Sequence, residues 1–165
     1  MFGVFDGHGR FGTECSTYAV NHLARNLVDQ DEYPDKFDEA FRKSFVCTNK
    51  AMHRQKKHRG TRKWFDDTHA GTTAICVTFD GHDVIVANVG DSRAVVAEMS
   101  GGRLRAYPLS VDQTPYRKDE RERCEREGAV VMTMDQLEGL KPPPNKASAQ
   151  RSCPSPPCGR HPPEH

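Results

Sequence analysis

The spacing of apolar residues in the first third of the chain predicts one short strand followed by two helices. The strand is a brief apolar stretch ended by an Asp-Gly pair, and it contains Phe2, Val4 and Phe5. A helix over residues 13–28 is indicated by apolar positions at a regular helical step, at Cys15, Ala19, Leu23 and Leu27. The same step predicts a second helix, at Phe37, Phe41 and Phe45, and three further positions widen its apolar stripe: Ala40, Cys47 and Met52. We expect Leu23, Leu27 and the three phenylalanines to pack on the outer face of a sheet built from residues 72–96.

From residue 71 to residue 109 the pattern is that of antiparallel strands. Strands are predicted at residues 72–79, 84–89, 94–98 and 104–108, and the first of them is rich in β-branched residues. The turns between them carry the sequences Asp-Gly-His-Asp, Gly-Asp-Ser-Arg and Ser-Gly-Gly-Arg. Because parallel strands need long crossovers, we expect these strands to form an antiparallel meander.

The last third predicts a charged helix, one more strand and a tail. Thr114 and Pro115 are suited to begin the helix, which runs through residues 116–127, and Gly128 is suited to end it. Residues 129–133 are expected to form a short strand. From residue 142 onward the chain holds 8 of its 11 prolines and almost no large apolar residue. Such a segment buries too little surface to offset its ordering entropy, so we expect residues 142–165 to be disordered.

Composition narrows the class of protein. The 24 Lys and Arg residues nearly balance the 23 Asp and Glu residues, so the charge favours neither a nucleic-acid partner nor a membrane surface. No apolar run approaches the roughly 18 to 20 residues that a membrane span needs, and the first residues do not resemble a signal peptide. We therefore expect a protein of the cytoplasm, the nucleus or both. The basic run of residues 53–63 is interpreted as a helix end and loop, with a nuclear address as the alternative.

The cysteines predict reduced thiols. Four of the six cysteines fall inside predicted helices or strands at wide spacing, at Cys15, Cys47, Cys76 and Cys124. This arrangement favours structural thiols over a disulfide framework.

The stretch VFDGHG near the start of the chain carries the first candidate chemistry. A strand that ends at Asp6 places a carboxylate at a sheet edge, where its two oxygens can bridge hard divalent cations. Gly7 and Gly9 allow the backbone to come close enough for a carbonyl to join the coordination. His8 can exchange a proton near neutral pH beside such a site. Alternatively the tetrapeptide is only a turn, as we expect for the related sequence FDGHD at residues 79–83.

The stretch ANVGDSRAVV at residues 87–96 carries the second candidate. A strand that turns at Gly-Asp-Ser-Arg places Asp91 at the end of a sheet, as the first stretch places Asp6. The alternative is a type I turn that the Asp and Ser side chains support through hydrogen bonds.

The order of these motifs resembles the type 2C family of metal-dependent protein phosphatases. VFDGHG is followed by two helices, AGTTA, ANVGDSRAVV, LSVDQTP and a charged helix that leads into EGAVV. The resemblance covers residues 1–141, which we interpret as a partial phosphatase domain. It implies an α+β fold, an α-β-β-α sandwich of antiparallel sheets with outer helices. It also implies a monomeric enzyme that hydrolyses phosphoserine and phosphothreonine on phosphorylated protein substrates.

The resemblance also assigns roles to single residues. Asp6 matches a carboxylate that bridges two Mg²⁺ or Mn²⁺ ions, and Gly7 matches a position whose carbonyl completes one metal site. His8 matches the proposed general acid that protonates the departing serine or threonine oxygen. Asp91 matches an aspartate linked to a third, weaker metal. Paired ions of this kind activate a water that attacks phosphorus directly, so no phosphoenzyme is required.

The chain departs from the family pattern at both ends. The family has strands before VFDGHG, with a basic residue that holds phosphate and an acidic metal ligand, and further metal-binding aspartates after the position of Gly139. Gln113 also replaces a histidine usual in the family, at a position that supports structure. With Asp6 as the only core carboxylate, we expect a truncated enzyme with weak metal binding and little or no activity. The alternatives are a phosphatase-like binding module without catalysis and a fragment without function.

A third alternative is a zinc module in the tail. Its ligands would be Cys153, Cys158, His161 and His165. Only two residues separate the second cysteine from the first histidine, against about twelve in a zinc finger, and the prolines oppose a helix.

Overall fold

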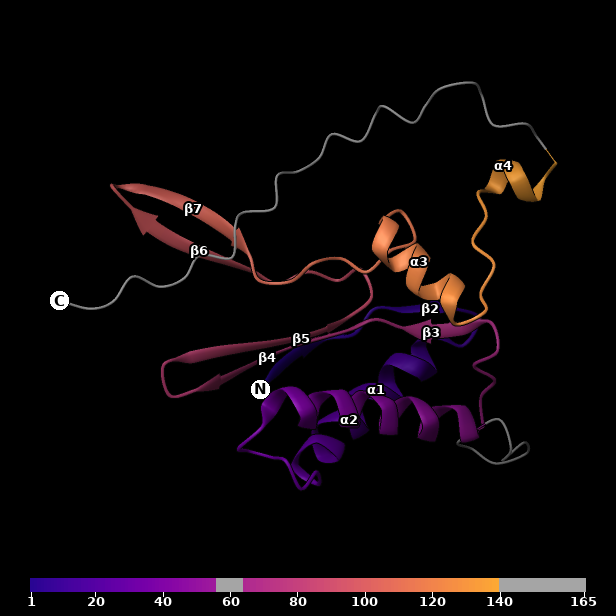
Figure 1. Ribbon diagram of the computed structural model, residues 1–165. Coiled ribbons are helices and arrows are strands. Elements are labelled where there is room, and N and C mark those ends of the chain that lie inside the picture. Colours follow the sequence, from indigo (N-terminus) through magenta and orange to yellow (C-terminus); the bar gives the residue numbers. More distant parts are fainter. Residues whose placement is uncertain (56–63, 140–165) are drawn as a thin grey trace. The chain divides into compact units, whose positions relative to one another are not determined.

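The computed structural model of the chain describes residues 1–55 and 64–139, and it combines α-helices with antiparallel β-strands (Figure 1). The chain divides into two units, with the boundary between Arg123 and Cys124. The candidate residues Asp6, His8 and Asp91 all belong to the first unit. The expected disorder of residues 142–165 and the zinc alternative in the tail lie outside the described residues.

Helix α1, Gly12–Val28, forms as its sequence predicts. Its buried positions are the four apolar residues at the expected spacing, with Gly12 at the start of the helix: Cys15, Ala19, Leu23 and Leu27. Every fourth residue of a helix lies on nearly the same face, so these side chains form one apolar stripe.

Helix α2, Phe37–His53, is built around smaller side chains than its sequence suggests. Phe41 is 3% exposed, whereas Phe37 and Phe45 are only partly buried. The remaining buried positions are Ala40, Ser44, Thr48 and Met52. The two hydroxyls are hydrogen-bonded, because the Ser44 side chain donates to the Phe41 carbonyl and Thr48 accepts from Asn26 of α1. Small and satisfied polar residues thus occupy part of the contact between the helices.

The two helices pack against a three-stranded antiparallel sheet. Its strands, in spatial order, are β1, Phe2–Val4; β4, Ala74–Asp80; and β5, Asp83–Val89. Cys76 of β4 joins Leu23, Leu27, Ala40 and Phe41 in one buried cluster. Phe37 and Phe45 pack at the border of this cluster. The expected packing of both helices on a sheet is therefore confirmed, but this sheet ends at Val89 and does not extend to residue 96 as predicted.

The opposite face of this sheet is apolar and largely open within the described part of the chain, although Ile75 on this face is buried. Residues paired across the strands share a face, so Phe2 and Val4 of β1 lie with Val77, Phe79 and Val84, away from Cys76. Phe2 is 71% exposed and Phe79 is 62% exposed, and their rings meet edge to face. An uncovered apolar face is what one inner surface of an incomplete sandwich presents.

The predicted four-stranded meander is wrong, although both of its hairpins form. Strands β6, Val95–Ser100, and β7, Arg103–Pro108, pair only with each other and make a separate sheet. The break follows Gly90, whose φ of +98° turns the chain out of the direction of β5. Another two-stranded sheet joins β2, Gly7–Gly9, to β3, Ala70–Thr72.

The region after β7 differs from the predicted pattern in two places. Helix α3 spans Lys118–Arg126 and begins later than Pro115, because a hydrogen bond from Arg117 N–H to the Thr114 carbonyl first closes a turn. Gly128 follows the helix with φ +88°, as expected for its role in ending it. Residues 129–133 do not form the predicted strand. They lead instead into the short helix α4, Met134–Leu137, which Thr133 and Gln136 begin with a capping box.

Cys15, Cys47 and Cys76 are free thiols. Cys15 and Cys76 are buried, Cys124 is half-buried and Cys47 is exposed. Burial raises the pKa of the Cys76 thiol to about 11, so this group stays protonated and unreactive at neutral pH. No helix of residues 1–55 and 64–139 is long and apolar enough to cross a bilayer.

Candidate active site

Asp6 lies between β1 and β2. Its backbone is hydrogen-bonded to Thr73, which lies between β3 and β4. The Asp6 N–H donates to the Thr73 side-chain oxygen at 3.0 Å, and the Thr73 N–H donates to the Asp6 carbonyl at 2.9 Å. Asp6 itself is exposed. A fixed backbone with an exposed carboxylate is an arrangement suited to binding a cation.

Gly7 is required by close packing against the start of α1. A Cβ built on Gly7 would lie 2.1 Å from the carbonyl oxygen of Gly12, the first residue of α1. A Cβ on Gly12 would in turn lie 2.6 Å from the Gly7 carbonyl carbon. Two glycines therefore allow the start of α1 to approach β2, and the metal role of Gly7 stays a prediction.

His8 is placed by the pairing of β2 with β3. It lies opposite Gly71, and a Cβ on Gly71 would come within 2.8 Å of the His8 Nε2 atom. The imidazole ring therefore lies against the backbone of β3. Any residue larger than glycine at position 71 would displace the ring. Gly71 and Thr73 both belong to the AGTTA stretch, which the sequence presents only as a part of the motif order.

Asp91 lies in the turn after β5, and this turn meets the Asp6 segment at Thr73. The Ser92 hydroxyl is 2.7 Å from the Thr73 hydroxyl, and a Cβ on Gly90 would lie 2.8 Å from the Thr73 Cγ2 atom. The structure thus connects the two candidate stretches through a single threonine. The Ser92 side chain bonds to this distant residue, which sets it apart from a serine that only supports its own turn.

The related sequence at residues 79–83 is a plain hairpin turn, as predicted. Asp80 and Asp83 form the last pair of the β4–β5 ladder, and Gly81 has φ +57°. Open space surrounds Gly81, because nothing lies within 4 Å of a Cβ built there. The same tripeptide therefore occurs once beside a packed helix and once at a free loop tip.

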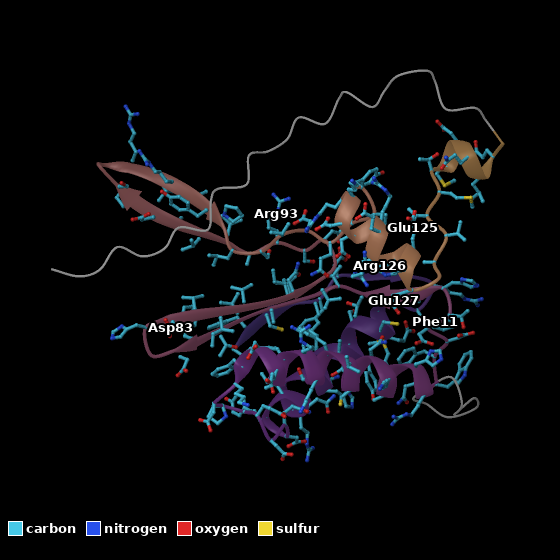
Figure 2. The ribbon with its side chains drawn as sticks, in the orientation of Figure 1. Phe11, Asp83, Arg93, Glu125, Arg126 and Glu127 are labelled. Atoms are coloured by element: carbon cyan, nitrogen blue, oxygen red, sulfur yellow. The ribbon has the colours of Figure 1, made fainter. Side chains whose placement is uncertain are left out.

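The turn that carries Asp91 is fixed from its other side by residues 112–113. The Arg93 guanidinium donates two hydrogen bonds to the Asp112 carboxylate, at 2.8 and 2.7 Å. Figure 2 shows Arg93 on the segment that joins β5 to β6. Gln113 donates from its backbone to the Gly90 carbonyl and from its side chain to the Asn88 carbonyl. Gln113 therefore has the structural role that the sequence indicates for its position.

The ion pair between Arg93 and Asp112 predicts how the stability of the fold changes with pH. The Arg93 guanidinium holds the pKa of the Asp112 carboxyl below its usual range. A carboxyl with a lowered pKa stabilises the fold above its unfolded pKa and loses that contribution as the pH falls through its folded pKa. We therefore expect Arg93→Gln to destabilise the chain at pH 7, with a difference from the wild type that shrinks as the pH falls below about 4. Urea unfolding at several pH values measures this difference.

Arg105→Gln is the matched control for this experiment. Arg105 is an exposed arginine on β7, so its loss should change stability little at any pH. A destabilisation by Arg93→Gln that stayed constant down to pH 2.5 would contradict a role for the Asp112 charge.

The candidate residues Asp6 and Asp91 are of the right type to bind a divalent cation, but they are too few to hold one by themselves. Asp6 and Asp91 offer hard carboxylate oxygens, which Mg²⁺ and Mn²⁺ prefer. Within residues 1–55 and 64–139, however, no group of three His, Cys, Asp or Glu side chains comes together at a spacing suited to a metal. A metal site built on these residues would need further donors.

A cavity of about 420 Å³ lies elsewhere, between α1 and the segment that precedes β3. Tyr18, His22 and Trp64 line it, and none of the candidate residues does. We therefore assign the candidate chemistry to the open edge around Thr73 and not to this cavity.

Comparisons with known proteins agree with one another. The family model described as "Protein phosphatase 2C" matches residues 1–140. The chain is 43% identical to "Probable protein phosphatase 2C 35" of Arabidopsis thaliana over 87% of its own length and 39% of that protein. It is 36% identical to "Probable protein phosphatase 2C 55" of Oryza sativa subsp. japonica, over 82% of its own length and 32% of that protein. The chain thus spans about two fifths or less of these relatives.

A solved structure shows the same fold. The crystal structure of serine-threonine phosphatase 2C from Toxoplasma gondii superposes with a TM-score of 0.60 at 20% identity. The match covers 86% of this chain and 54% of that one. The α+β fold is therefore confirmed, in an incomplete domain.

Proposed function

The chain belongs to the protein phosphatase 2C family, and from this premise we propose that it serves the metal-dependent hydrolysis of phosphoserine and phosphothreonine on proteins. The observation that carries this proposal is the convergence of VFDGHG, AGTTA and GDSR on Thr73, which places Asp6 beside the Asp91 turn. Free thiols in the described residues favour a reducing compartment, and we place the protein in the cytoplasm or the nucleus.

We assign the roles at the site as follows. Asp6 would hold a pair of Mg²⁺ or Mn²⁺ ions together with the Gly7 carbonyl, and Asp91 would bind a weaker third ion. Bound ions of this type supply activation of water and neutralisation of phosphoryl charge. His8, seated against Gly71, would donate a proton to the departing serine or threonine oxygen.

For the chain by itself we propose weak metal binding and little turnover. The incomplete donor set among the described residues supports this view. It also favours a second candidate function, a phosphatase-like module that binds phosphoproteins without hydrolysing them.

The proposed function is tested with a graft, in which residues 1–139 replace the aligned segment of the Arabidopsis relative. The parent relative serves as the positive control. We expect the graft to release phosphate from a phosphothreonine peptide when Mn²⁺ is present and to stop when EDTA removes it. Peptide binding without any phosphate release, in a folded graft of an active parent, would favour the binding module instead.

His8→Ala in the same graft tests the role of the histidine. General acid catalysis contributes about 10²- to 10⁴-fold, and it matters most when the leaving group is a poor one. We expect a loss of this size on the phosphothreonine peptide and a much smaller loss on p-nitrophenyl phosphate, whose leaving oxygen hardly needs a proton. His82→Ala, in the related sequence at the hairpin tip, should affect neither substrate. Equal losses on both substrates would argue against proton donation by His8.

A further inference from the structure

A line of hydrogen bonds runs from the Asp91 turn to the backbone of Asp6. The Ser92 hydroxyl bonds to the Thr73 hydroxyl at 2.7 Å, and the Thr73 hydroxyl accepts the Asp6 N–H at 3.0 Å. The residues are far apart in sequence, 19 positions for the first bond and 67 for the second. Thr73 and Ser92 are both half-buried, so water competes only partly for their hydroxyls.

The Ser92 end of this line is the fixed end. Gly90 is held by the Gln113 N–H at 2.9 Å, and Arg93 is held by Asp112 through two hydrogen bonds. Ser92 lies between these two anchored residues. The Ala94 N–H in addition donates to the Ser110 side chain at 3.0 Å. The turn is therefore a rigid support from which the Ser92 hydroxyl reaches Thr73.

The Thr73 end needs such a support. Its hydroxyl accepts the Asp6 N–H, and a threonine side chain could turn this oxygen away by changing its χ1 rotamer. The bond from Ser92 opposes that rotation. Hydrogen bonds in a line also strengthen one another, so the loss of one end weakens the other.

We propose that Ser92 is a positioning residue that fixes the Asp6 backbone through Thr73 and so holds the Asp6 and Asp91 segments in one arrangement. This inference deepens the proposed function, since it concerns the same site and rests on the role proposed for Asp6. It can be tested without metal or substrate, because it predicts how strongly one backbone amide, that of Asp6, is hydrogen-bonded.

The test is amide hydrogen exchange measured by NMR on the full chain, for the wild type and Ser92→Ala. The net contribution of one hydrogen bond corresponds to about a three- to tenfold change, so we expect the Asp6 amide to exchange faster by this factor. Amides of α1 and α2 should exchange as in the wild type, which a general loss of stability would not allow. Ser92→Thr, which keeps the hydroxyl, should restore slow exchange at Asp6. Ser100→Ala, at the end of β6, should leave the Asp6 amide unchanged.

Mn²⁺ line broadening on the same samples separates this inference from the proposed function. We expect Mn²⁺ to broaden the Asp6 and Gly7 amide signals of the wild type, and to require a higher concentration in Ser92→Ala. Faster exchange at Asp6 without any such broadening would support Ser92 as the residue that fixes Asp6 and would count against the metal role of Asp6. Unchanged exchange at Asp6 in Ser92→Ala would overturn the inference whatever the metal does. If Ser92→Ala failed to fold, Ser92→Cys would be measured in its place, because cysteine has a similar shape but is a weak hydrogen-bond partner. Faster exchange at Asp6 would again support the inference, and unchanged exchange would overturn it.

Discussion

Phe41→Ala is expected to lower the free energy of unfolding by about 3 to 5 kcal/mol, which is the range for removing a phenylalanine ring from a packed core. Phe41 is 3% exposed and joins Leu23 and Leu27 of α1 to Cys76 of β4 in one cluster. Its ring also lies between those of Phe37 and Phe45, with ring centres 6.4 and 6.1 Å away. A loss of this size is comparable to the whole stability of many small domains, so the variant could fail to fold. Urea unfolding followed by circular dichroism measures the effect.

Val46→Ala is the matched control on the same helix. Val46 is 47% exposed, and surface substitutions usually change stability by no more than about 0.5 kcal/mol. Equal unfolding midpoints for wild type and Phe41→Ala would contradict the placement of the core between the helices and the sheet.

The elements with a strong local period could be predicted from the sequence. The four-residue step in α1 selects its buried residues correctly, because burial of one stripe is a property of the helix itself. The same step misjudges part of α2, where Ser44 and Thr48 are buried, Phe45 is only partly buried and Cys47 is exposed. Which residues of a helix face its neighbour depends on the fit of both surfaces, and spacing alone does not contain that information.

The division of the strands into separate sheets was not predictable from local pattern. The predicted meander follows from alternating apolar residues and tight turns, and each hairpin does form. Whether β5 continues to pair with β6 depends on the path of residues 90–94. That path is set by bonds to residues 109–113, such as the bond from Leu109 N–H to the Ala94 carbonyl. Contacts at this sequence distance leave no periodic signal.

The residues of the candidate site, too, could be predicted only in part from the sequence. Asp6, His8 and Asp91 could be proposed from residue type and from the resemblance of their motifs to a family. Thr73 and Ser92, which join these motifs, carry no reactive group that would single them out. The sequence suggests that Gly7 lets a carbonyl reach a metal, and the structure shows a further constraint at this position, the carbonyl oxygen of Gly12. A glycine in a motif can therefore serve packing and chemistry at the same position.

Asp6→Ala is expected to have the largest effect on function. Loss of a group that only supports a metal ligand typically costs 10- to 100-fold in affinity or activity, so loss of a direct ligand, the role proposed for Asp6, should cost at least about 100-fold. We expect a loss of this size in the Mn²⁺-dependent activity of the grafted relative. In the chain alone, calorimetry should show weak Mn²⁺ binding that Asp6→Ala removes, because no three candidate ligands among the described residues are grouped to hold the ion elsewhere.

Asp80→Ala separates a metal role of Asp6 from a general effect of removing negative charge. Asp80 begins the same Asp-Gly-His tripeptide, but it lies at the exposed tip of the β4–β5 hairpin. The two variants change net charge equally, so screening of long-range charge should affect them alike. Because only Asp6 has its backbone fixed by Thr73 next to the Asp91 turn, only its loss should reduce Mn²⁺ binding and activity. If both variants bound Mn²⁺ as the wild type does, VFDGHG would be a packed turn in this chain, and the metal would be held by other residues.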